Sequence, residues 1–245
     1  MPDITHFRPV RGGNVFEETV ARLLQIIRLG IVAPGGVLPP ERELATLFEV
    51  SRDTVREAIA SLTGAGFLLA KRGRYGGTFV CEPLPSAAAD RARAAASTTA
   101  TTTDPAHVGT QITDVLIVRE VLEVGAARAA AERPVGPAES TELRQHLLAV
   151  SSAAPDDYRR LDSRLHLAFG ELAGSSSLVT LLAENRMLVN SLLDGIPLLA
   201  RNISHSNDQH ERIVAAVLAG DPEAAGQAMR EHLAGTAALL HGFLA

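Results

Sequence analysis

The 245-residue chain is poor in the residues that mark several protein classes. Its only cysteine, Cys81, excludes an intrachain disulfide and with it a disulfide-stapled secreted scaffold. The sequence has no run of about eighteen apolar residues, which argues against a transmembrane helix. The opening "MPDITHFRPVRGG" also lacks the apolar stretch of a signal peptide. These absences predict a cytoplasmic protein with no membrane partner.

Aromatic residues make up only 4% of the chain, and alanine and leucine dominate, which favours helices. The net charge of −5 is unevenly spread. Residues 1–82 hold ten Lys+Arg against nine Asp+Glu, whereas residues 83–245 hold thirteen against nineteen, so the parts carry +1 and −6. An acidic protein can still bind nucleic acid through a local cluster of cations, so net charge alone neither favours nor excludes DNA.

The first third of the chain has the pattern of a winged helix-turn-helix, which we predict over residues 10–82. Apolar periodicity predicts a helix over 16–30, and proline followed by acidic residues predicts another over 39–48. Ser51 is a good N-cap for a third helix, "RDTVREAIASLTGAG". Two short apolar runs, 67–70 and 78–80, flank a basic loop with glycines and predict a hairpin.

Residues 83–106 are rich in Ala, Ser, Thr and Pro and predict a linker, in which 86–96 could form a short helix. The remainder, 107–245, shows helical periodicity and no strand pattern. We therefore predict a mainly α protein, with an all-α antiparallel helical bundle after the winged helix. The bundle helices are expected at about 108–132, 137–150, 156–173, 177–194, 205–219 and 222–243.

The winged helix carries candidate DNA-binding residues. Arg52 and Arg56 lie one turn apart at the start of the third helix and face away from its apolar stripe, where a guanidinium can read guanine or hold a phosphate. Arg42 is placed for the DNA backbone. Lys71, Arg72 and Arg74 charge the wing loop, and Gly76 and Gly77 would allow close approach of its backbone to DNA. The alternative is an ordinary solvated basic face.

Four polar residues interrupt apolar stripes of the bundle helices. Asp162 and His166 are an i, i+4 pair on one helix, while His210 and His232 lie on the apolar faces of two others. If these residues converge, a divalent cation bound between them would offset the cost of removing them from water. Zinc is the first candidate, and nickel, manganese or iron are also compatible. The alternative is that each histidine is a hydrogen-bonded core residue.

Arg119 also points inward, in register with apolar residues of the first bundle helix. It could form a salt bridge with Glu123 or another acid. The functional alternative is an effector-binding role, in which Arg119 anchors an organic carboxylate that also ligates the metal.

The stretch "LPPERELATLFEVSRDTVREAIASLTGAGFLLAKRGRYGGTFV", residues 38–80, resembles the winged helix of the GntR family of bacterial transcription regulators. This resemblance implies that Arg42, Arg52 and Arg56 contact the operator, assisted by Thr54, Gly76 and Gly77. It also implies a homodimer on a palindromic double-stranded DNA site.

The segments "ITDVLIVREVLEVGAARAAAER", "DSRLHLAFGELAG", "QHERIVAAVLAGD" and "MREHL" are similar to the FCD effector domain of the FadR subfamily. The resemblance implies metal ligation by Asp162, His166, His210 and His232, and sensing of a small organic acid. Leu165 departs from the family pattern, which usually has Phe before this histidine, but it remains apolar.

The sequence therefore predicts a dimeric, ligand-responsive transcription regulator, with repression as the expected mode, and not an enzyme. One alternative is a metal-dependent hydrolase or lyase that uses the His/Asp site. Against it, Glu171 and Glu211 lie off the histidine stripes and provide no obvious general base. The other alternative is a metalloregulator, for which the cation itself is the signal.

Overall fold

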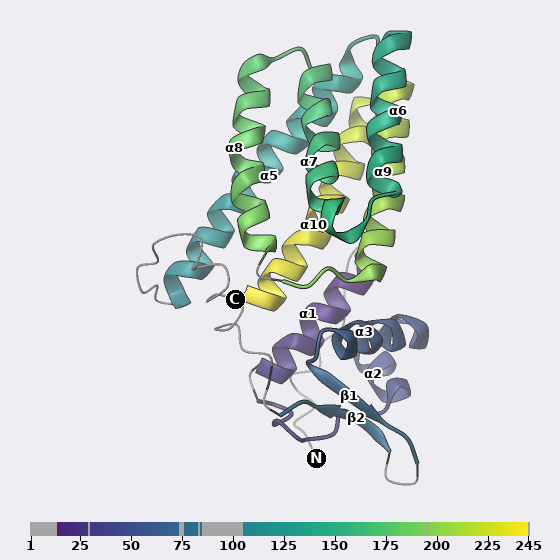
Figure 1. Cartoon of the computed structure of the whole chain (residues 1–245), viewed down its shortest axis with the longest axis vertical. Helices are drawn as coiled ribbons and strands as arrows, with labels where there is room; N and C mark the ends of the chain where they lie inside the picture. The colour runs from purple at the N-terminus through teal and green to yellow at the C-terminus, as the bar shows by residue number, and fades with distance from the viewer. Residues whose placement is uncertain are drawn as a thin grey trace. The chain divides into compact units, whose positions relative to one another are not determined.

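The computed structural model of the chain describes residues 14–28, 30–73, 76–82, 84, 105–194 and 196–244. The described parts are mainly helical, with one antiparallel two-stranded sheet (Figure 1). The chain divides into two compact units. The first comprises residues 1–109, 195–202 and 235–245, and the second comprises 110–194 and 203–234. The predicted fold class, a winged helix-turn-helix followed by a helical bundle, is confirmed.

The winged helix lies in the first unit and contains three helices and a hairpin. These elements are α1 (Val15–Arg28), α2 (Glu41–Phe48), α3 (Arg52–Gly64), β1 (Leu68–Lys71) and β2 (Gly77–Val80). Ser51 caps α3, because its side chain accepts a hydrogen bond from the Thr54 N–H at 3.0 Å. Glu49 ends α2 in the left-handed region, with φ of 57°, which lets the chain turn sharply between α2 and α3.

One face of each of these helices is buried, and this decides which residues remain exposed. Phe48 of α2 and Val55 and Leu62 of α3 are fully buried. The opposite face of α3 is therefore exposed to solvent, and it includes Arg52, the first residue of the helix.

The hairpin pairs Leu68 with Val80 and Lys71 with Gly77. Gly76 is required at its loop, because a Cβ atom there would lie 2.5 Å from the Lys71 carbonyl oxygen. Gly77 packs against Val37, whose Cγ2 would be 3.0 Å from an added Cβ. The backbone of the hairpin thus requires glycine at position 76, whereas at position 77 the exposed side chain of Val37 would only have to shift.

The bundle helices are α5 (Pro105–Glu132), α6 (Pro137–Ser151), α7 (Pro155–Leu172), α8 (Ser176–Leu193), α9 (Ala200–Ala219) and α10 (Pro222–Leu244). Proline stands in the first turn of α6, α7 and α10, where its missing N–H costs no helical hydrogen bond. Gly174 and Gly220 follow α7 and α9 with positive φ, as at many helix ends. The bundle core includes Leu143, Leu165, Phe169, Leu182, Ile213 and Met229.

The predicted bundle helices all form, and their observed bounds differ from the predicted ones by a few residues. The largest difference is at α9, which begins at Ala200 rather than at residue 205. Most of the predicted linker 83–106, including the possible helix at 86–96, lies outside the described residues; its last two residues are the first two of α5. Within the described ranges, no helix is both long and apolar enough to cross a membrane.

Candidate functional site

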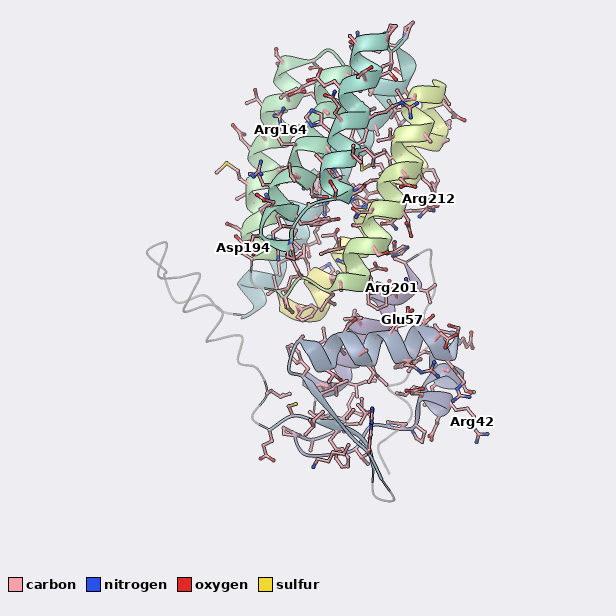
Figure 2. The ribbon with its side chains drawn as sticks, turned by 45° about the vertical axis from the view of Figure 1, so that its right-hand side comes forward. Arg42, Glu57, Arg164, Asp194, Arg201 and Arg212 are labelled. Carbon is pink, nitrogen blue, oxygen red and sulfur yellow. The ribbon has the colours of Figure 1, made fainter. Side chains whose placement is uncertain are left out.

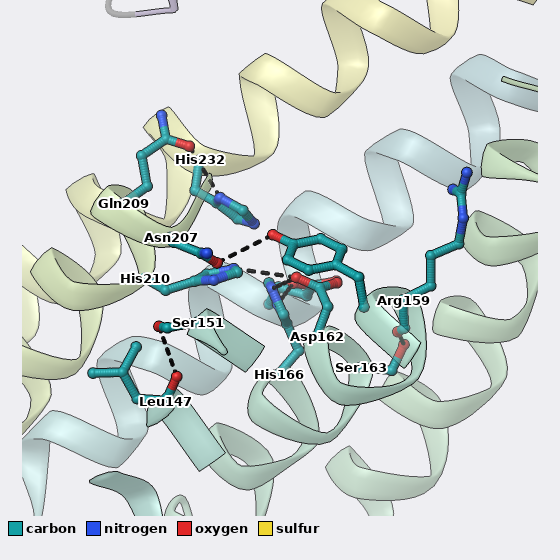
Figure 3. A network of polar contacts seen from close by, with 12 residues as sticks. Leu147, Ser151, Arg159, Asp162, Ser163, His166, Asn207, Gln209, His210 and His232 are labelled. Atoms are coloured by element: carbon teal, nitrogen blue, oxygen red, sulfur yellow. Dashed lines mark hydrogen bonds and ion pairs between the residues drawn. The ribbon is translucent and has the colours of Figure 1, made fainter. Parts of the chain in front are cut away.

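Three helices of the second unit bring Asp162, His166, His210 and His232 together. Asp162 and His166 come from α7, His210 from α9 and His232 from α10. Each offers one ligand atom, and these atoms all lie within 4.8 Å of one another. The three histidines are buried, and the Asp162 side chain is 13% exposed. Figure 3 shows the three imidazoles turned toward the carboxylate of Asp162. The structure therefore assembles all four residues of the predicted metal site.

Neighbouring side chains fix the tautomers of two of these histidines. His166 Nδ1 is hydrogen-bonded to Glu123 Oε2, and His232 Nδ1 lies 3.1 Å from Gln209 Oε1 (Figure 3 shows the second contact). Carboxylate and amide oxygens only accept hydrogen bonds, so each Nδ1 carries the proton. The lone pair of each Nε2 is consequently available to a metal ion.

The polar atoms at the centre of the cluster fit a cation. His210 Nε2 lies 3.2 Å from Asp162 Oδ1, and His166 Nε2 lies 3.7 Å from the same oxygen. In the described part of the chain, His166 Nε2 and His210 Nδ1 are buried without a hydrogen-bond partner. A buried polar atom without a partner is costly, and a divalent cation held by nitrogen and carboxylate ligands would remove the cost at His166 Nε2.

Two arginines and a second carboxylate surround the cluster. Arg186 of α8 contacts Asp162 Oδ2 through Nη2 and approaches Glu123 Oε1 to 3.5 Å through Nη1. Arg119 Nε donates to Glu123 Oε1 at 3.1 Å, while Arg119 Nη1 has no partner in the described part of the chain. Arg119 thus points into the bundle as predicted and also forms the salt bridge with Glu123 that was its alternative role.

Arg186 and Gln209 are residues of the site that the sequence analysis did not name, and Glu123 was named there only as a partner of Arg119. Arg186 could have been found, because it is in helical register with the buried Leu182 and Val189. Gln209 gave no such signal, since it precedes His210 and its role depends on the neighbouring α10.

These ion pairs set the charges of the site. Burial by itself would raise the pKa of Asp162, but the positive charge of Arg186 brings that pKa well below its ordinary value. Burial opposes ionisation of Glu123 in the same way, and His166, Arg119 and Arg186 together hold its pKa well below normal. Two carboxylates therefore balance two guanidinium groups.

Burial acts in the opposite direction on the histidines. Desolvation lowers the pKa of His166, and it lowers the pKa of His232 well below normal, with further effects from His210 and His166. Neutral imidazoles are favoured, and these are the protonation states that bind a metal ion.

The predicted DNA-binding residues lie on the exposed face of the winged helix. Arg42 and Arg52 are exposed, and Figure 2 shows Arg42 projecting from α2. Arg56 is also exposed, but its guanidinium already contacts Asp53 at 2.8 Å and Glu41 at 3.3 Å. Thr54 Oγ1 is 2.8 Å from Ser51 Oγ, so it takes part in the cap of α3. Of the two predicted α3 contacts, Arg56 is therefore the one whose guanidinium is already held by carboxylates.

The wing contributes a second group of cations. Lys71 and Arg72 are exposed, and Lys71 Nζ lies 4.7 Å from the centre of the Phe79 ring. Gly76 is exposed and Gly77 partly so. Arg74, the remaining predicted wing contact, lies outside the described residues.

Comparison with known proteins gives two family matches in one chain. Residues 16–80 match the family described as "Bacterial regulatory proteins, gntR family", and residues 114–235 match the "FCD domain". A protein of Escherichia coli (strain K12), named for its regulation of the L-lactate dehydrogenase operon, is 30% identical over 243 residues, covering 89% of this chain and 83% of its own.

Two further comparisons extend this result. The HTH-type transcriptional repressor NanR of Enterobacter sp. (strain 638) is 28% identical over 244 residues, covering 96% of this chain and 89% of its own. Among solved structures, E. coli McbR/YncC has a TM-score of 0.50 at 18% identity, covering 92% of this chain and 96% of that one. At that identity the structural likeness concerns the fold alone.

The lowered pKa of His232 generates a prediction about the metal-free protein. The folded state keeps His232 neutral, whereas in the unfolded chain this histidine takes up a proton near pH 6.5. The free energy of unfolding is therefore highest above that pH and decreases as the pH falls below it. With a chelator present, the free energy of unfolding in urea should decrease between pH 7.5 and 5.5, by at most about 1.4 kcal/mol per pH unit for each such histidine.

The substitution His232→Gln should reduce this pH dependence, since it removes one titrating group. The control His241→Gln alters an exposed histidine on the same helix and should leave the dependence as in the wild type. Equal pH dependence in all three proteins would contradict the role assigned to the burial of His232.

Proposed function

Because this chain belongs to the GntR family of bacterial transcription regulators and carries an FCD effector domain, we propose that it is a repressor controlled by a small organic acid bound at a metal centre. It is a DNA-binding regulator, and its relatives are regulators rather than enzymes. One relative is named a repressor, and another is named for regulation of the L-lactate dehydrogenase operon. The observation that carries the proposal is the buried set of three histidines and one aspartate.

The four ligands of the proposed centre are Asp162, His166, His210 and His232. FCD domains often bind metals, and this donor set suits zinc first, with nickel, manganese or iron also compatible. Arg186 contacts Asp162 Oδ2 and His210 lies beside Oδ1, so Oδ1 is the oxygen that Asp162 would offer to the ion. The metal ion, when bound, supplies a Lewis-acidic position that can accept an oxygen atom of an organic acid.

Arg119 is the proposed anchor for the effector's carboxylate. Its guanidinium is buried and held by Glu123 through Nε, which leaves Nη1 as a donor without a partner in the described part of the chain. A planar guanidinium is well suited to bind carboxylates. The two arginines and two carboxylates already balance, so a bound divalent ion adds positive charge that favours an anionic ligand.

The operator is read by α3, with Arg52 at base edges and Arg42, Arg56, Lys71 and Arg72 near phosphates. Thr54, Arg74, Gly76 and Gly77 are expected to assist at the same face. Effector binding alters operator affinity only if the effector favours one arrangement of the dimer over another. We infer that the occupied state favours the arrangement that fits the operator less well.

The dimer is proposed to form through α5 and α8. These helices are neighbours, since Asn185 Nδ2 of α8 donates to the Val115 carbonyl of α5 at 3.1 Å. Both helices carry large apolar side chains that are exposed in the single chain, and a group of such side chains marks an interaction surface. The outward residues are Ile117, Val118, Val121, Leu181, Met187 and Leu188. A second copy of the chain is the proposed partner, because a two-fold dimer matches a palindromic operator.

The metal and effector proposals can be tested together. Wild-type protein should bind one equivalent of Zn²⁺ per chain in calorimetry, and His210→Ala should lose most of this affinity, whereas His241→Ala should retain it. In the zinc-loaded protein, at least one acid from a panel of small carboxylates should raise the melting temperature. In Arg119→Lys, the concentration of that acid needed for the same rise in melting temperature should be about tenfold higher or more. Lysine keeps the positive charge but lacks the planar guanidinium group.

The matched control for this experiment is Arg128→Lys, on the same helix and partly exposed. If zinc alone changes operator affinity and no carboxylate does, the protein is a metalloregulator and the organic-acid part of the proposal fails. Wild-type protein without zinc affinity would contradict the metal centre itself.

The DNA-reading face is tested with DNA flanking the protein's own gene. Arg52→Ala should weaken sequence-preferring binding in fluorescence anisotropy by about tenfold or more, as expected for a guanidinium that contacts a base. Arg160→Ala, which removes an exposed arginine of α7, should have no effect. Binding that is equally tight in the Arg52 variant would remove α3 from the interface.

The proposed dimer face is tested by Val121→Glu, which places a charge at a position that is 69% exposed in the single chain. Sedimentation velocity should show a wild-type dimer and a largely monomeric variant, because burying an unpaired carboxylate is costly. Leu148→Glu on α6, at a residue that is 68% exposed, should remain dimeric. A variant at Val121 that dimerises like the wild type would place the interface elsewhere.

A further inference from the structure

Glu123 lies beside the proposed metal centre without being one of its ligands. It belongs to α5, its side chain is 1% exposed, and it contacts residues of two other helices. An ionised carboxylate in such a place requires partners for both oxygens, because its desolvation is otherwise costly. The structure supplies those partners, and each oxygen has a different set.

One oxygen faces a metal ligand and the other faces arginines. Glu123 Oε2 accepts the hydrogen bond of His166 Nδ1, while Oε1 accepts that of Arg119 Nε at 3.1 Å and lies 3.5 Å from Arg186 Nη1. Arg186 in turn holds Asp162 Oδ2 and so closes a ring of contacts that includes two of the four ligands.

These contacts determine the orientation of two side chains as well as the charge of the site. Because Glu123 can only accept a hydrogen bond from His166, it keeps the proton on Nδ1 and directs Nε2 toward the other ligands. The same carboxylate holds Arg119 by Nε and so sets the direction of the rest of its guanidinium group. A displacement of Glu123 would therefore disturb both residues together.

We propose that Glu123 is a positioning residue that orients His166 for the metal ion and Arg119 for the effector's carboxylate, and thereby couples the two binding events. The proposal rests on the proposed function, because it needs a metal ion and an anionic ligand at this site. Coupling between two ligands is reciprocal, so a change at Glu123 must alter each ligand's effect on the other.

The first test measures Zn²⁺ affinity by competition with a chromophoric chelator. Glu123→Gln should bind Zn²⁺ about 10- to 100-fold more weakly, the loss typical when the carboxylate partner of a ligating histidine is removed. Glutamine is nearly isosteric, but its single acceptor oxygen cannot serve His166 and the arginines at once. Glu120→Gln is the matched control, since Glu120 is exposed on the same helix.

A second variant separates position from charge. Glu123→Asp keeps the negative charge but withdraws the carboxylate by one methylene, so it should also weaken Zn²⁺ binding. Full affinity in Glu123→Asp together with a loss in Glu123→Gln would mean that only charge matters, and it would overturn the positioning role. Should the glutamine variant fail to fold, the aspartate variant alone decides the question.

Spectroscopy and a carboxylate probe complete the test. The visible spectrum of the Co²⁺-loaded protein reports ligand geometry, and it should differ between wild type and Glu123→Gln but not between wild type and Glu120→Gln. Titration of the Co²⁺-loaded protein with acetate should show weaker binding in Glu123→Gln. Unchanged spectra and unchanged acetate affinity would overturn the proposal.

The outcomes for Glu123 and for the proposed function are distinct. A wild-type protein that binds neither Zn²⁺ nor Co²⁺ contradicts the metal centre, whatever the variants do. A wild type that binds both ions while Glu123→Gln binds them equally well leaves the metal centre intact and refutes the role of Glu123.

Discussion

The mutual compensation of buried charges around α7 is the constraint on which the proposed site depends. Asp162 and Glu123 can remain ionised inside a helical bundle only because Arg186 and Arg119 reach them from α8 and α5. These contacts hold the carboxylates in place, while burial lowers the pKa of His166 and of His232 and so favours the neutral imidazoles that ligate metals. The bundle therefore has to keep α5, α7 and α8 at fixed distances.

Apolar packing in the bundle also holds the polar cluster in place. Leu165 and Phe169 of α7 are fully buried, and they lie beside His166 on the face that carries the ligands. Side chains in a close-packed core have little freedom to change rotamer, so apolar contacts around the polar cluster hold it in one geometry. Gln209 performs the same task by hydrogen bonding, since it sets the tautomer of His232 from the neighbouring helix α9.

In the winged helix, local structure determines which side chains are exposed. The cap at Ser51 and the buried stripe of α3 leave Arg52 in solvent at the start of the helix. The loop of the hairpin has room only for glycine at position 76. Arg56 differs from its neighbour, because Asp53 and Glu41 already share its guanidinium group. The two arginines are thus unequal candidates for contact with bases.

Periodicity and local turn chemistry were enough to predict the helices, the hairpin and the four inward polar residues Asp162, His166, His210 and His232. Periodicity also indicated the inward direction of Arg119. The meeting of the four residues, and the contacts of Arg186 and Glu123 with them, came from the packing of the helices. Helical periodicity reports which face of a helix is buried, whereas the partners of a buried charge depend on how helices distant in sequence are aligned.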